Sequence, residues 1–120
     1  MRTLRNAVRE DKVWGYEETI ANGSYCGKLL VIYKGGKCSE HFHIHKDEVF
    51  YMLCGRVRMY LIYQDATHKE FIMMPGDILD VPPGLVHSFE GLDDDNKIIE
   101  VSTTHSSDDS YRITKSTLSQ

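Results

Sequence analysis

Apolar residues gather in short runs along most of the chain, and turn residues separate the runs. Short apolar runs bounded by turn signals predict β-strands, and no long segment shows the period of a helix. Turn signals such as Asn22-Gly23-Ser24 and Pro82-Pro83-Gly84 separate the runs. The predicted strands cover residues 13–20, 28–33, 39–44, 48–53, 56–63, 70–74, 78–81, 86–90 and 98–104. Many short strands at close intervals predict an all-β, small jelly-roll β-barrel.

The length of 120 residues predicts a single domain. We expect residues 13–104 to form the barrel, because the predicted strands lie there. Residues 1–12 are polar and charged, and we expect an N-terminal arm that is either frayed or a short edge segment. Residues 105–120 are rich in Ser, Thr and Asp, and we expect a C-terminal tail of irregular structure.

Composition and net charge bear on whether the protein binds nucleic acids or membranes. Hydrophobic residues make up 41% of the chain, charged residues 27%, and the net charge is −4. Because phosphate contacts need clustered Lys and Arg, which the sequence lacks, nucleic-acid binding is not expected. No apolar run reaches membrane-spanning length, and the N-terminal stretch lacks the apolar region of a signal peptide. We therefore expect no membrane partner.

The three cysteines indicate a cytoplasmic location. Cys26, Cys38 and Cys54 are odd in number and form no C-x-x-C pair. This pattern predicts free thiols in a reducing compartment, packed as small hydrophobic side chains. Cys38 precedes His41 by three residues, so a thiol close to a site at His41 is an alternative.

Most of the candidate functional residues lie in residues 35–55, where histidines occupy the alternate positions 41, 43 and 45. Because residues two apart in an extended strand point to the same face, His41 and His43 should project together. Glu48 follows after a short polar turn and opens the next predicted strand. Two imidazoles and a carboxylate that converge form a transition-metal site in outline. His87, in a later strand, is the candidate for a fourth ligand.

Two spaced motifs carry a family resemblance. The first reads G-x5-H-x-H-x4-E-x6-G through Gly35, His41, His43, Glu48 and Gly55. The second reads G-x5-P-x-G-x2-H through Gly76, Pro82, Gly84 and His87. In order and spacing they resemble the two motifs of the cupin superfamily. The resemblance implies a jelly-roll barrel that binds one divalent transition metal, with Zn, Mn, Fe, Co and Ni all compatible, through His41, His43, Glu48 and His87.

Further segments resemble the small mannose-6-phosphate isomerase-type cupins. The segments that carry this likeness are residues 14–18, 25–30, 75–77, 99–103 and 108–112. It implies a metal-dependent isomerase that acts on a sugar or sugar phosphate through an enediol. A divalent metal would polarise the carbonyl and hold the neighbouring hydroxyl, while a base moves the proton.

Three residues are the catalytic candidates for that reaction. His45 is the free histidine nearest the predicted metal centre and could act as the acid/base. Lys28 could point inward to a phosphate or sugar oxygen, or it could be a solvated strand end. Arg112 could close over the mouth of the site as an anion clamp. His68 and His105 are interpreted as incidental.

Two other functions stay open beside the isomerase. One is a non-enzymatic cupin that binds a sugar or regulates a sugar-pathway partner. The other is an Fe(II)-dependent, oxygen-using cupin, since three histidines and a glutamate also suit that chemistry. Apolar residues on both faces of residues 48–53 predict a homodimer.

Overall fold

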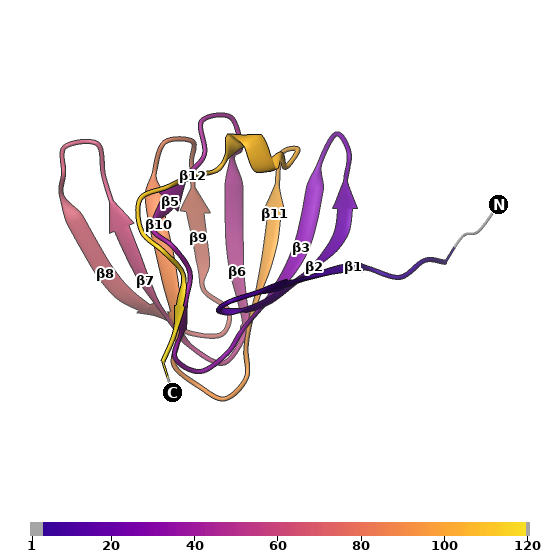
Figure 1. The fold of residues 1–120 in the computed structure, drawn as a ribbon, viewed down its shortest axis with the longest axis horizontal. Helices are drawn as coiled ribbons and strands as arrows, with labels where there is room; N and C mark the ends of the chain where they lie inside the picture. Colours follow the sequence, from indigo (N-terminus) through magenta and orange to yellow (C-terminus); the bar gives the residue numbers. More distant parts are fainter. Residues whose placement is uncertain (1–3, 120) are drawn as a thin grey trace.

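The fold is built from two β-sheets that enclose a common interior (Figure 1). In this computed structural model residues 4–119 are described. The first sheet has six strands, in the order β1 (Val8–Lys12), β2 (Gly15–Asn22), β3 (Cys26–Ile32), β11 (Asn96–Ser102), β6 (Glu48–Cys54) and β9 (Ile78–Val81).

The second sheet is assembled around β10 (Val86–Gly91), which pairs with strands on both sides. On one side lies β7 (Val57–Ile62), followed by β8 (His68–Met73). On the other side lie β4 (Gly36–Lys37) and β5 (His41–Phe42), which pair with β13 (Thr117–Leu118) and β12 (Tyr111–Arg112) respectively. A short 3-10 helix, η1, spans Ser107–Asp109. The all-β jelly-roll barrel expected from the sequence is confirmed.

Alternating side chains from the two sheets fill the interior. β6 buries Glu48, Phe50 and Met52, while β7 buries Val57, Met59 and Leu61. These strands therefore enter the core with the period of two of an extended chain. The core cluster comprises Trp14, Leu30, Ile32, Cys38, Phe50, Met52, Val57, Met59, Leu61, Met73, Val81, Leu85, Phe89 and Ile98.

The start of the barrel differs from the expectation of one strand over residues 13–20. β1 and β2 form a hairpin, with Lys12 paired to Gly15 across a two-residue turn at Val13 and Trp14. Val and Trp both favour strands, so a turn at these two positions was not predicted, although Gly15 follows them directly. Trp14 is buried, and its ring meets Phe89 edge-on at 5.0 Å. β1 is thus an edge strand within the region expected as an arm, whose residues 1–3 lie outside the described part.

The tail beyond residue 104 runs along the segment that carries the histidines (Figure 1). Its residues bond to that segment, with Ile113 donating to the Glu40 carbonyl at 2.7 Å and Ser39 donating to the Ser116 hydroxyl at 3.0 Å. The expectation of a wholly irregular tail is wrong in this respect, because hydrogen bonds to a distant segment give it η1, β12 and β13. Gln120 lies outside the described residues.

Within the described residues no helix is long and apolar enough to cross a membrane. The three cysteines are free thiols, as predicted. Burial raises the pKa of the Cys38 thiol to about 12, so Cys38 stays protonated and lacks the thiolate needed for catalysis.

Candidate metal centre

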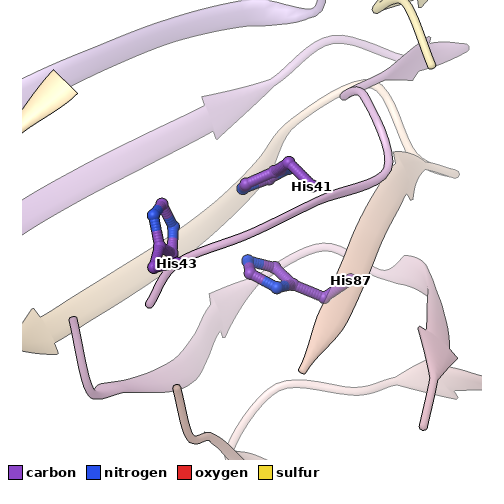
Figure 2. Close-up of side chains that lie close together, drawn as sticks. All are labelled: His41, His43 and His87. Atoms are coloured by element: carbon purple, nitrogen blue, oxygen red, sulfur yellow. The ribbon is translucent and has the colours of Figure 1, made fainter. Parts of the chain in front are cut away.

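Strand register brings the three motif histidines together. His41 on β5 lies directly opposite His87 on β10 in an antiparallel pair, and their ring centroids are 4.3 Å apart. His43 follows two residues after His41 and points the same way, with 5.3 Å between the two ring centroids. One nitrogen from each ring lies within 4.8 Å of the others (Figure 2). The predicted convergence of His41 and His43, joined by His87, is present in the structure.

All three rings are held in the same tautomer by backbone carbonyls. The Nδ1 atoms of His41, His43 and His87 lie 2.7 Å from Ser39 O, 2.9 Å from Asp109 O and 2.9 Å from Leu85 O respectively. Because a carbonyl oxygen can only accept, each Nδ1 must carry the hydrogen. In a neutral ring with this tautomer Nε2 presents a lone pair, the form in which imidazole binds a metal.

Glu48 reaches the same cluster from the other sheet. Its Oε2 lies 3.3 Å from His87 Nε2 and 3.5 Å from His43 Nε2. Glu48 Oε2 and His87 Nε2 are buried and have no hydrogen-bond partner among the described residues. Two buried lone pairs that face each other are costly unless a cation lies between them. The donor set of three imidazoles and one carboxylate fits a divalent transition metal on this ground.

The protonation states suit metal binding. Burial lowers the pKa of His41 to about 3 and also lowers that of His43, so both rings are neutral near pH 7. Burial alone would raise the pKa of Glu48, but the His87 ring and the Lys46 charge outweigh it, and the pKa is lowered. The carboxylate is thus ionised beside the neutral rings of His41 and His43.

Lys46, which the sequence did not single out, holds Glu48 in place. Its buried ammonium lies 3.2 Å from Glu48 Oε1 and 2.6 Å from Glu100 Oε2. Since Oε1 is occupied by Lys46, Oε2 is the oxygen left for the histidine cluster. The Lys46 Nζ also lies 3.0 Å from His105 Nδ1. His105 thus lines the cavity beside Lys46, although it is not a member of the three-histidine cluster.

The turn between β5 and β6 decides which side chain of that loop faces inward. His45 is exposed and does not line the cavity, whereas Lys46, the next residue, is buried within it. The structure therefore does not place His45 where the predicted acid/base would have to be. Lys46, Glu100 and His105 are among the titratable groups that do line the cavity.

The other two catalytic candidates do line the cavity. Lys28 is buried, and its Nζ forms a 3.2 Å ion pair with Glu17 Oε2. The alternation along β3, which also buries Cys26 and Leu30, turns Lys28 inward and excludes the solvated strand end. Arg112 is exposed on β12, and its pairing with His41 places it at the cavity.

The cavity has a volume of about 900 Å³ and opens beside the histidine cluster. One part of its wall is apolar, from Trp14, Leu30, Phe50 and Phe89. The rest is polar, and charged side chains from the first sheet and the tail contribute most of it. Such a cavity accommodates a small organic molecule that presents oxygen atoms to the cluster.

Comparison with known proteins identifies the family. The model of the family described as "Cupin" matches residues 22–119, and the chain belongs to this family. Among curated proteins the chain is 29% identical to an oxalate decarboxylase of Arthroderma benhamiae over 90 residues, which is 72% of this chain and 21% of that protein. It is 36% identical to the quercetin 2,3-dioxygenase of Bacillus subtilis over 56 residues, 47% of this chain and 15% of that protein.

Solved structures agree on the fold. The oxalate decarboxylase of Bacillus subtilis superposes with a TM-score of 0.80 at 17% identity, over 89% of this chain and 30% of that one. The capsular polysaccharide assembling protein CapF of Staphylococcus aureus superposes with a TM-score of 0.81 at 17% identity, over 92% of this chain and 32% of that one. The chain thus spans about a fifth or less of the two curated relatives, 21% and 15%. It is a cupin with a three-histidine cluster suited to a divalent metal.

Proposed function

We propose that this cupin is an enzyme that uses one divalent transition metal held by His41, His43, Glu48 and His87. The observation that carries the proposal is the pair of buried, unpartnered atoms His87 Nε2 and Glu48 Oε2, 3.3 Å apart in the cluster. A metal ion bound there would act as a Lewis acid toward a substrate oxygen.

The first candidate reaction is the isomerisation of a sugar or sugar phosphate. It requires a group that removes a proton from one carbon and returns it to the next. Among the carboxylates that line the cavity we assign this role to Glu100, because burial raises its pKa. Lys28 on the buried wall and Arg112 at the exposed rim supply cations for a phosphate group. In this proposal Glu100 takes the role that the sequence assigned to His45.

The second candidate is an oxygen-using reaction on a small acid or enol. The name of one curated relative, a quercetin 2,3-dioxygenase, favours the use of oxygen, and the name of the other, an oxalate decarboxylase, favours a small acid as the substrate. The same three histidines and glutamate suit Fe(II) as well as the isomerase metals. The apolar wall formed by Trp14, Phe50 and Phe89 would accommodate an aromatic or unsaturated substrate.

One experiment separates the candidates. The protein is loaded with Mn, Fe, Co, Ni or Zn and incubated in D2O with aldoses, ketoses, their phosphates and small carboxylic acids. Deuterium incorporation next to the carbonyl, followed by NMR, supports the isomerase, whereas consumption of O2 supports the oxygen-using enzyme. Either signal must vanish in His43→Ala, while His68→Ala on the exposed part of β8 serves as the control. Metal binding without either signal would leave a non-enzymatic sugar-binding or regulatory cupin.

A further inference from the structure

Asp109 fastens the tail to the loop between β5 and β6. Its carboxylate accepts hydrogen bonds from three consecutive backbone N–H groups of that loop. Ile44 N lies 2.9 Å from Oδ1, while His45 N and Lys46 N lie 3.1 Å and 2.9 Å from Oδ2. The side chain is buried, with 8% of the residue exposed. Three charge-assisted bonds from one carboxylate fix the path of the loop.

The backbone of the same residue holds a histidine of the cluster. The carbonyl oxygen of Asp109 accepts a hydrogen bond from His43 Nδ1 at 2.9 Å. The hydroxyl of Ser110 is the only other described group near this nitrogen, at the longer distance of 3.4 Å. Asp109 therefore fixes both the loop that follows His43 and the hydrogen on its ring.

His43 differs in this respect from the other two histidines. His41 and His87 bond to carbonyls only two residues away, Ser39 and Leu85, which belong to their own segments. The partner of His43 is 66 residues away in the sequence and belongs to the tail. A change at Asp109 should hence disturb one ring of the cluster and leave two unchanged.

We propose that Asp109 is a positioning residue of the metal centre, which acts through His43. By anchoring the loop it places its own carbonyl against Nδ1, keeps the hydrogen there, and directs the Nε2 lone pair into the cluster. The role rests on the proposed metal-dependent function. Neither the H-x-H motif nor the later motif includes Asp109, which stands among the Asp and Ser residues of the tail.

The test begins on the metal-free protein. Long-range 1H–15N spectra of 15N-histidine-labelled protein report the tautomer of each ring. In the wild type we expect His41, His43 and His87 to carry the hydrogen on Nδ1. In Asp109→Asn only His43 should change to a mixture of tautomers, because the NH2 group of the amide is a donor and cannot accept the hydrogen bonds that one carboxylate oxygen accepts from the loop N–H groups.

Titration with Co2+ supplies the second readout. Asp109→Asn should weaken Co2+ binding by about 10- to 100-fold, the usual effect of losing an outer partner of a ligand. Asp108→Asn is the matched control, since Asp108 is the exposed neighbour on η1 and should bind Co2+ like the wild type. Ser110→Ala should also leave the tautomer of His43 unchanged, because the carbonyl of Asp109 remains.

Several results would overturn the role. The first is a folded Asp109→Asn variant in which both the His43 tautomer and the Co2+ affinity are unchanged. The second is a wild type in which His43 carries the hydrogen on Nε2. This second result needs no variant, so it can be obtained even if every Asp109 variant fails to fold. Failure of the wild type to bind Co2+ would overturn the proposed function instead, and the metal-free spectra would still decide the role of Asp109.

Discussion

Lys46 Nζ lies 3.2 Å from Glu48 Oε1, and both side chains are only 2% exposed. This buried ion pair orients the carboxylate of a proposed metal ligand from outside the histidine cluster. The same ammonium lies 2.6 Å from Glu100, so a single cation compensates two buried carboxylates.

We expect Lys46→Met to weaken metal binding and to destabilise the fold. Loss of the ammonium frees Glu48 to rotate and leaves two buried carboxylates without a cation. Breaking a buried pair in this way costs about 3–5 kcal/mol of unfolding free energy. Urea unfolding of the metal-free variant measures this cost. Lys115→Met, at an exposed lysine of the tail, should change stability by less than about 0.5 kcal/mol. Equal effects of the two substitutions would contradict the role of Lys46.

We expect His87→Ala to lose bound metal and to keep the barrel fold. The substitution removes one of the proposed ligands and should weaken binding by more than about 100-fold, beyond the effect of losing an outer partner. Metal content after dialysis and the circular dichroism spectrum measure the two parts of the prediction. His68→Ala removes an exposed histidine and should leave the metal content unchanged. Wild-type metal content in His87→Ala would remove His87 from the ligand set.

The stability of the protein should depend on pH through His105. Burial, together with the nearby Lys46 charge, lowers the pKa of His105 to about 4 from its ordinary 6.5. Since the unfolded state then binds a proton that the folded state does not, His105 costs stability as the pH falls from 6.5 toward 4. As the pH falls through this window, the unfolding free energy of the wild type minus that of His105→Gln should therefore decrease.

Urea unfolding at several pH values tests this dependence. Because His105 is only partly buried, we expect the difference to shrink by about 1 kcal/mol rather than by the full value of the shift. His68→Gln should show no such trend, since His68 is exposed on β8. A difference that is constant between pH 7 and pH 4 would contradict the prediction.

We propose a homodimer through the outer face of the first sheet. Large apolar side chains there are well exposed, with Tyr51 at 39%, Ile78 at 68% and Val101 at 53%. They lie on the adjacent strands β9, β6 and β11, where Tyr51 pairs with Ile78 and Val101 with Val49. A twofold axis would place this face against itself and remove it from water.

Light scattering at micromolar concentration tests the dimer. Tyr51→Glu should give monomers, because a charge at the centre of the apolar face cannot be desolvated cheaply. His68→Glu, a substitution on the second sheet, should leave the mass of the dimer measured by light scattering unchanged. A monomeric wild type would contradict the proposal.

Local sequence patterns were sufficient to predict most of the fold and the centre of the site. Short apolar runs between turn signals identified most of the interior strands, the H-x-H spacing predicted that His41 and His43 project together, and the second motif of the family resemblance added His87. Such runs and spacings are local features, which the sequence shows directly.

The remaining features depend on contacts between distant segments. Val13 and Trp14 form a turn because the Trp14 ring packs inside the barrel, against their local preference for strand. The inward side chain of the loop is Lys46 rather than His45, since Asp109 bends the backbone there. His105 and Asp109 join the site from the tail. Spacing in the sequence carries no signal for such contacts.

The proposed ligands come from both sheets, with Glu48 on β6 of the first sheet and the three histidines on or next to β5 and β10 of the second. A metal ion shared by them would be a cross-link between the two layers. Its release would require the layers to move apart locally, so the rate of metal exchange should follow the opening fluctuations of the barrel. A tightly folded barrel would then retain its metal ion because dissociation is slow, as well as because binding is tight.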